Sequence, residues 1–347
     1  MMRLVKACLC MGAVLAMAAA AQAEPLNLKH VSASSGWLGH VDIDAIRDST
    51  VARRLVQRHM EHHKQTDAQL KMLEGLTGIN LLTDLHGLTF YGPQIGKHHA
   101  VIILHAKMDK GILQGWAERI PKRETGNHGD HAIQSWTHEH RGHKHTVSSA
   151  WYGQDRLVVA SGVEDLKSAL DVLDGKASSV AEDAPLAGNI PAGTTVLFRA
   201  VGISSIECKE PLVKQIESFR FVSGEHNGES FHRSRIVTNN AETAGQLKDI
   251  AEGMRALLAI HCRGNETGKK LVNAANIKLD DKTMTVLWSA SADDVWAITE
   301  AHIKIIEARI AKHREHRKHR GDHGKGHAPK SEKPKPAEPK KSPEEDF

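Results

Sequence analysis

Short apolar and alternating runs in the first half of the chain predict strands. Residues 39–45 alternate Val41 and Ile43 with Asp42 and Asp44, the pattern of a half-buried strand. The continuous apolar run at 100–106 predicts a central strand. Further strands are expected at 88–91, 132–140, 143–152 and 156–160. Helical spacing predicts a long helix from Ser49 or Thr50 to about Gly75, and shorter helices at 109–119 and 164–173.

The second half repeats this order after a linker-like segment at 176–193. Strands are expected at 195–201, 215–224, 229–239, 275–279 and 283–290. An amphipathic helix is expected at 241–260, and Ser291 can cap a last helix from 293. We therefore predict an α+β fold of two similar units, 24–178 and 194–310, each a mainly antiparallel sheet packed with helices.

Both ends of the chain differ from the body. Residues 1–23 carry Arg3 and Lys6, an apolar run, and the small-residue site Ala21-Gln22-Ala23. This pattern predicts a signal peptide cleaved after Ala23, hence a periplasmic or secreted protein with no transmembrane segment after cleavage. Residues 311–347 form a basic, His-rich stretch and then a Pro/Lys/Glu-rich stretch, which we expect to be disordered at least from about residue 321.

Charge narrows the choice of partners. The chain has 46 Lys and Arg against 42 Asp and Glu, a formal net charge of +4. Without residues 1–23 and 311–347, the remaining body of the chain has 33 basic and 35 acidic residues, so the body is slightly acidic. No specific nucleic-acid binding is expected. The basic tail can contact an envelope protein or an anionic surface.

Four segments carry a resemblance to a known group of proteins. They are GHVDIDAIRDSTVARRL, LTGINLLTDLHGLTFYG, DRLVVASGVEDLKSALDVLDG and LVNAANIKLDDKTMTVLWSAS. They resemble uncharacterised exported bacterial proteins that pair two α+β halves behind a signal peptide. The resemblance implies the same architecture and transfers no activity and no site residue.

Histidine is the unusual residue type, with 24 in the chain. The densest group is His138, His140, His143 and His145. A two-residue turn at 141–142 would pair His140 with His143 and His138 with His145, with all four imidazoles on one face and Glu139 and Lys144 opposite. Such a group suits Zn²⁺, Ni²⁺ or Cu²⁺. His128 and His131 are weaker additional candidates, and the alternative is a solvated hairpin tip without a metal.

Two further candidate sites consist of only two residues each. His59 and His63 are four residues apart on the first long helix and can chelate one ion, although semi-buried helix histidines fit the pattern better. Cys208 and Cys262 are the two cysteines of the mature chain, and they form either one disulfide or two separate thiols.

No catalytic motif is found. The sequence lacks a Gly-x-Ser-x-Gly elbow, a phosphate-binding glycine loop, a dinucleotide fingerprint and a Cys-x-x-Cys pair. We therefore expect an exported non-enzymatic binding protein that buffers or senses transition metal through the 138–145 hairpin. The alternative is a structural or partner-binding envelope protein with incidental histidines, and an enzyme with a cleft between the halves is the third option.

Overall fold

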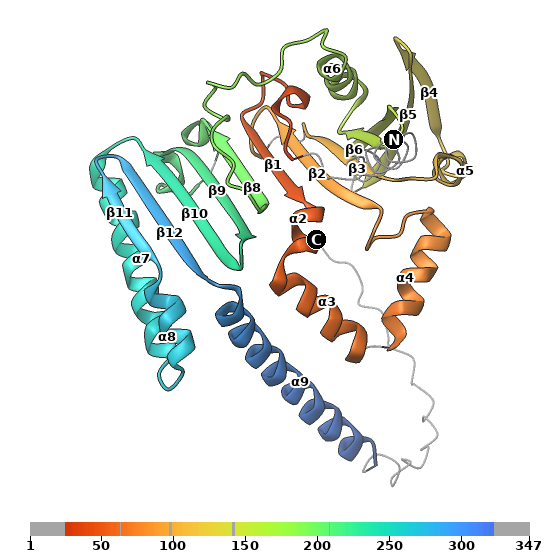
Figure 1. Ribbon diagram of the computed structural model, residues 1–347. Coiled ribbons are helices and arrows are strands. Elements are labelled where there is room, and N and C mark those ends of the chain that lie inside the picture. Colours follow the sequence, from red (N-terminus) through yellow and green to blue (C-terminus); the bar gives the residue numbers. More distant parts are fainter. Residues whose placement is uncertain (1–24, 63, 97–98, 141–142, 208, 323–347) are drawn as a thin grey trace, which may run out of the picture. The chain divides into compact units, whose positions relative to one another are not determined.

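The computed structural model describes residues 25–62, 64–96, 99–140, 143–207 and 209–322 (Figure 1). Within these ranges, the side chains of 64–67, 140, 143, 311 and 313–322 are left undescribed. The body of the protein ends at Ile298, and the chain from Thr299 onward is a second compact unit, whose described part is the continuation of the last helix.

The described strands of the body form one antiparallel sheet of twelve strands (Figure 1). Their order is β11-β12-β10-β9-β8-β1-β2-β3-β7-β6-β5-β4. The strands are β1 Trp37–Asp42, β2 Leu85–Gly92, β3 Val101–Ala106, β4 Arg123–His128, β5 His131–His140, β6 His143–Tyr152, β7 Arg156–Ala160, β8 Thr194–Val201, β9 Ile216–His226, β10 Glu229–Thr238, β11 Asn276–Asp280 and β12 Thr283–Ser291. The predicted α+β class with antiparallel pairing is confirmed.

The described helices lie between strands, except α9, which follows the last strand. They are α2 Ile43–Asp48, α3 Thr50–His62, α4 Lys64–Thr77, α5 Lys110–Glu118, α6 Val163–Leu173, α7 Ala241–His261, α8 Glu266–Asn273 and α9 Ala292–Asp322. In the described part of the chain, short 3-10 turns lie at Leu28–His30, Ile203–Ser205 and Val213–Gln215. No described helix is both long enough and apolar enough to cross a membrane.

The two halves of the sequence meet at the antiparallel pair of β1 and β8. On one side of this pair the sheet continues through β2 and β3 to β7, and on the other through β9 and β10 to β12. In the first half three strands are followed by α5, four strands and α6. In the second half three strands are followed by α7 and α8, two strands and α9. The two halves therefore contribute to one continuous sheet, and the division into the units 24–178 and 194–310 stays a prediction.

One row of directly paired residues shows which side chains share a face of the sheet. The row runs Asn276, Leu287, Arg233, Val222, Leu197, His40, Thr89, Ile103, Val158, Ala150, Ile133 and Gly126. Directly paired residues point to the same side. The helix α6 packs on this side, where Leu166 and Leu170 join Val158 and Ile133 in the core.

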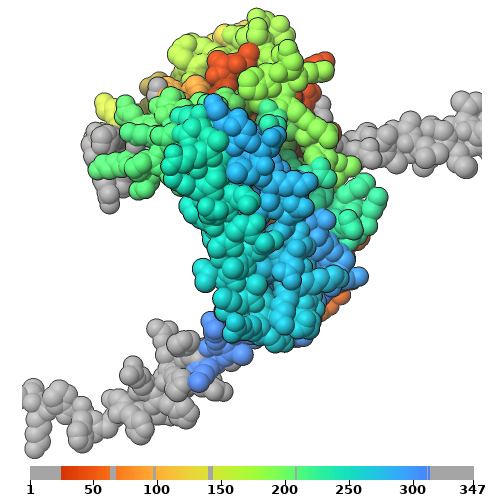
Figure 2. Space-filling model, turned by 90° about the vertical axis from the view of Figure 1, so that its left-hand side faces the viewer, coloured from red at the N-terminus to blue at the C-terminus, as the bar shows by residue number. Residues whose placement is uncertain are grey.

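The helices α7 and α8 cover the opposite side of the sheet in the second half. Trp288, one residue along β12 from Leu287, donates its indole N–H to Leu271 O of α8 at 2.7 Å. α7 carries exposed apolar side chains such as Met254 and Leu257, which are 60% and 68% exposed. This helix forms much of the surface in the view of Figure 2.

Several helices begin at a residue whose side chain caps the first turn. Asp109 accepts from Ile112 N at 3.1 Å, Asn240 from Thr243 N at 2.8 Å, and Ser291 from Asp294 N at 3.1 Å. Each bond satisfies a backbone N–H that the first turn of a helix leaves unpaired.

The first helical region differs from the prediction of one long helix. The structure has α3 and α4, and residue 63 between them lies outside the described residues. Leu55 and Leu73, apolar residues of the predicted helix, are 44% and 41% exposed. Packing of an apolar face supplies most of the stability of a long helix. Because these positions are exposed, that packing is weak and does not favour one uninterrupted helix.

Candidate functional site

The hairpin of β5 and β6 has the register predicted from the sequence. His138 pairs with His145, His140 with His143, and Glu139 with Lys144. Side chains alternate between the two faces of a strand, so the four histidine positions share one face and Glu139 and Lys144 lie on the other. This part of the prediction is confirmed.

Hydroxyl pairs on the α6 side of the sheet fix this register. Ser135 Oγ lies 2.9 Å from Ser148 Oγ, and Thr137 Oγ1 lies 3.0 Å from Thr146 Oγ1. Ser148 is fully buried. A shift of one residue would move every side chain to the other face and break these pairs. The hydroxyl pairs on this face therefore maintain the register that pairs the histidines on the opposite face.

The side chains of His138 and His145 are exposed at the far end of the hairpin. Those of His140 and His143 lie outside the described side chains. Among the side chains that are described, no group of three or more His, Cys, Asp or Glu is arranged to hold a metal ion. On the same face, Trp136 and Val147 form the next cross-strand pair and give the histidine positions an apolar neighbour.

His128 and His131 lie at the other end of β5. They form a cross-strand pair of their own, on β4 and β5. His131 is seven residues from His138, a distance of about 23 Å along a strand. The structure therefore does not bring these two histidines together with the 138–145 group.

Both of these histidines are bonded to carboxylates of the α6 region instead. His128 Nε2 lies 2.7 Å from Asp171 Oδ1, and His131 Nε2 lies 3.1 Å from Asp174 Oδ1. The pKa of Asp174 is lowered, mainly by its hydrogen bond with Lys176 and further by His131. These pairs fasten α6 to the sheet, a role that the sequence analysis did not assign to them.

The remaining predicted residues fall partly outside the described chain. His59 is exposed on α3, and its proposed partner His63 lies outside the described residues. Cys262 is half-buried, and its proposed partner Cys208 lies outside the described residues. The chelating pair and the disulfide therefore stay predictions.

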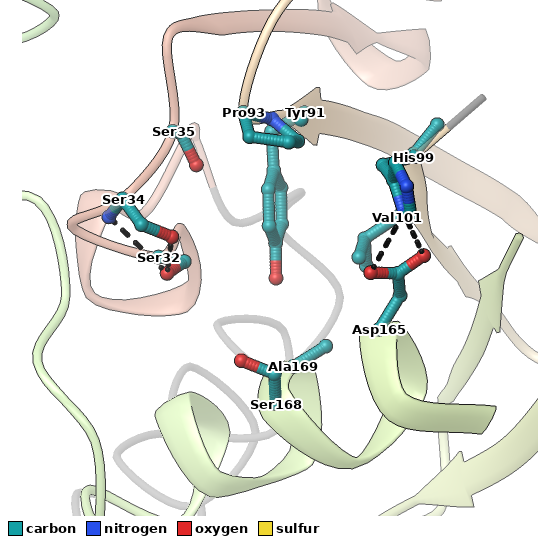
Figure 3. A pocket seen from close by; sticks show the side chains of 12 residues that line it. Ser32, Ser34, Ser35, Tyr91, Pro93, His99, Val101, Asp165, Ser168 and Ala169 are labelled. Atoms are coloured by element: carbon teal, nitrogen blue, oxygen red, sulfur yellow. Dashed lines mark hydrogen bonds and ion pairs between the residues drawn. The ribbon is translucent and has the colours of Figure 1, made fainter. Parts of the chain in front are cut away.

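A pocket of about 420 Å³ lies between the loop at Ser32–Ser35, the end of β2, and α6 (Figure 3). The ring of Tyr91 points into it, and the Tyr91 hydroxyl is buried with no hydrogen-bond partner in the described residues. Burial raises the pKa of Tyr91. At the rim, His99 Nδ1 lies 3.0 Å from Asp165 Oδ2.

This pocket has the residue types of a serine–histidine–aspartate site without its geometry. In the described part of the chain, Ser32 and Ser34 bond to each other at 2.9 Å, and no serine hydroxyl bonds to His99. A nucleophile needs hydrogen-bond contact with its base. The arrangement gives no support for acyl-transfer chemistry.

Sequence reasoning missed the pairing of histidine with aspartate in the first half. Besides the α6 pairs, His86 bonds to Asp44 at 3.0 Å and His105 to Asp155 at 2.8 Å. The acids of α6, in VEDLKSALDVLDG, were visible in the sequence as Asp165, Asp171 and Asp174. Their partners were not, because each lies more than forty residues away.

The architecture defines an antiparallel α+β protein. No protein-family model matches the chain, and no curated protein matches it. Solved structures that match include crystal forms III and IV of TP0453, a Treponema protein. Form III has a TM-score of 0.42 and 9% identity, and the match covers 81% of this chain and 100% of that chain. Form IV has a TM-score of 0.42 and 10% identity, and the match covers 80% and 97%.

Proposed function

We propose that the chain is an exported, non-enzymatic binding protein that captures a transition-metal ion at the tip of the β5–β6 hairpin. The observation that carries the proposal is the register, which pairs His138 with His145 and His140 with His143. Zn²⁺, Ni²⁺ and Cu²⁺ are the ions that imidazole groups favour.

The backbone geometry suits one ion held by four imidazoles. Cross-strand neighbours are about 5 Å apart and same-face neighbours on one strand about 7 Å apart, so the four Cβ atoms outline a small rectangle. Its centre is roughly 4 Å from each corner, within reach of an imidazole nitrogen. A tetrahedral ion needs four ligands, and the hairpin supplies four.

The surroundings of this face favour binding as well. Lys144 pairs with Glu139 on the opposite face, so its cation does not stand among the ligands. The adjacent pair of Trp136 and Val147 is apolar. An apolar neighbour lowers the local dielectric and strengthens the interaction between the ion and its ligands.

Calorimetric titration of the mature protein, purified without a metal-affinity column, tests the proposal. We expect one Zn²⁺ or Ni²⁺ per chain with a dissociation constant of about 1 μM or tighter, equivalent to roughly −8 kcal/mol. Replacing His138, His140, His143 and His145 by alanine should weaken binding at least 100-fold.

The control is the double variant His128→Ala and His131→Ala, which removes a cross-strand histidine pair from the other end of β5. It should retain the tight site. Tight binding by the quadruple variant, or its loss in the control alone, would reject the hairpin as the metal site.

The second candidate function is that of a structural or partner-binding envelope protein. The observation that favours it is the exposed apolar surface of α7, where Met254, Leu257 and Leu258 are each more than half exposed. Absence of metal binding in the unmodified protein would favour this second function.

A further inference from the structure

Arginines line the side of the second half of the sheet that faces away from α7 and α8. Arg199 of β8 is paired directly with Arg220 of β9, and Arg220 with Arg235 of β10. Thr285 and Lys278 continue the same row onto β12 and β11. Five strands therefore present Arg, Arg, Arg, Thr and Lys side by side on one face.

The same row changes from cationic to apolar residues where it enters the first half of the sheet. Arg199 is paired with Leu38, and the row continues through Tyr91, Val101 and Ala160. These residues are buried in the core beneath α6. The row is apolar where α6 packs on the sheet, and it is cationic on β8, β9 and β10.

The segment at 185–191 folds over the edge of the arginine row. Arg199 Nη1 donates to Leu186 O at 2.9 Å, and Arg199 Nη2 donates to Gly188 O and Asn189 O at 3.2 Å. Arg220 Nη2 donates to Pro185 O at 2.7 Å. A Cβ at Gly188 would lie 3.2 Å from Arg220 Nη1, so glycine allows this segment to approach closely.

Together these elements line a pocket that is open to solvent. Arg199, Arg220, Arg233 and Arg235 all line it, and none of the lining residues is an aspartate or glutamate. No ion pair joins any of the four to a carboxylate within the described part of the chain. Arg199 is 2% exposed, and burial together with the charge of Arg220 lowers its pKa.

Four cations without a counter-ion destabilise the folded protein. Like charges directly opposite each other on neighbouring strands repel, and a buried arginine loses its hydration. The carbonyl groups that Arg199 and Arg220 contact carry no net charge and leave the repulsion in place. A bound dianion would remove it.

We propose that this pocket is a binding site for a phosphate group. Arginine is the residue that best matches phosphate, because its planar fork donates two parallel hydrogen bonds to two oxygens. The oxygens of one phosphate can accept from several guanidinium groups at once, and its charge of about −2 suits a cluster of four cations. The phosphate is either a free ion or the headgroup of an anionic lipid.

The site is independent of the metal-binding hairpin. It lies on strands of the second half, and its residues include no histidine. A failure to bind metal would not affect the phosphate proposal. A failure to bind phosphate would not affect the metal proposal.

Binding is tested with the mature full-length protein in phosphate-free buffer. One arm titrates inorganic phosphate by calorimetry. The other measures co-sedimentation with phosphatidylcholine vesicles, with and without phosphatidylglycerol. Saturable binding in either arm is expected, and the arm that responds identifies the source of the phosphate. Failure of both arms at millimolar phosphate and at millimolar lipid would overturn the proposal.

Substitutions of the two exposed arginines, Arg233 and Arg235, test whether this pocket is the binding site. Arg233→Gln with Arg235→Gln should weaken binding at least tenfold, and Arg235→Lys should weaken it less because the charge remains. The control, Lys248→Gln with Arg263→Gln, removes the same charge from α7 and the turn after it, and should bind as the parent does. Equal weakening by both double variants would show general charge attraction and would contradict the site.

Thermal unfolding provides a readout that a purely structural role would not give. Without phosphate, Arg235→Gln should raise the melting temperature because it relieves repulsion. With saturating ligand, the parent should gain more stability than the variant, because only the parent binds tightly. A lower melting temperature of Arg235→Gln under both conditions would assign Arg235 a structural role and overturn the proposal.

Discussion

His40 is a histidine buried in the middle of the sheet. Its side chain is 5% exposed, and Nδ1 lies 2.9 Å from Thr89 Oγ1. Nε2 is buried with no partner in the described residues. His30, His105 and Arg156 line the same small cavity. Burial lowers the pKa of His40 to about 4, so the folded protein keeps this ring neutral at pH values where an exposed histidine is charged.

This burial makes the fold sensitive to acid. Below about pH 6.5 the unfolded chain takes up a proton at His40, whereas the folded protein does so only near pH 4. The free energy of unfolding therefore falls as the pH drops through this window, by at most about 3 kcal/mol in total. Urea titrations at several pH values should show a shallower fall for His40→Gln than for the parent. Parallel curves would contradict this role.

Glu225 acts at the scale of elements, because it joins the two halves of the body. From β9 it accepts from Thr50 N at 2.7 Å and Val51 N at 3.2 Å, and from Ser49 Oγ at 3.0 Å. It therefore caps the first turn of α3 with a negative charge. Burial raises its pKa, but the hydrogen bonds from Thr50, Val51 and Ser49 outweigh burial, and the net shift is downward.

Removing this cap should destabilise the protein. Glu225→Ala leaves two N–H groups of α3 without a partner, and we expect a loss of about 1–2 kcal/mol. The lowered pKa means that Glu225 stabilises the fold above the carboxyl's ordinary value of 4.5, and that this contribution disappears as the pH falls below it. Chemical denaturation measures the loss, with Glu217→Ala, an exposed acid on the same strand, as the control. Equal stability of the two variants would count against the capping role.

The helix α6 is fastened to the sheet by histidine–aspartate pairs at both of its ends. Asp165 bonds to His99 near the start, and Asp171 and Asp174 bond to His128 and His131 at the end. The end pairs are mostly shielded, with side-chain exposures of 15–33%.

Asp171→Asn with Asp174→Asn should loosen this attachment. We expect a loss of roughly 1 kcal/mol for the double variant, the scale of partly exposed ion pairs. Hydrogen exchange should become faster across Val163–Leu173 and stay unchanged in α7. Unaltered exchange in α6 would show that apolar packing alone holds the helix. Metal binding at the hairpin should be unaffected.

At the scale of the whole molecule, local features were predictable and distant contacts were not. Caps such as Asp109 and Ser291 depend on neighbouring residues, and the register of β5 with β6 follows from the length of their turn. The pairing of β1 with β8 joins segments far apart in the sequence, and no local pattern indicates it. The strand β4 was missed because its residues, RETGNH, are polar and show no alternation.

The same limit applied to the sites. The four histidine positions of the hairpin are neighbours in sequence, so their shared face could be inferred. The arginine row leaves a weaker signal in the sequence. Arg233 and Arg235 lie on one side of a strand, and Arg220 lies between two phenylalanines. Only the order of β8, β9 and β10 brings Arg199, Arg220 and Arg235 together.

Metal capture by the hairpin is the central claim, and X-ray absorption by the bound ion tests it most directly. The mature protein, loaded with one equivalent of Zn²⁺ or Ni²⁺, should show a first shell of about four nitrogens near 2.0–2.1 Å, with the outer-shell scattering of imidazole rings. This signature should vanish in the variant lacking His138, His140, His143 and His145. A first shell of oxygens, or an imidazole signature that persists in the variant, would contradict the account.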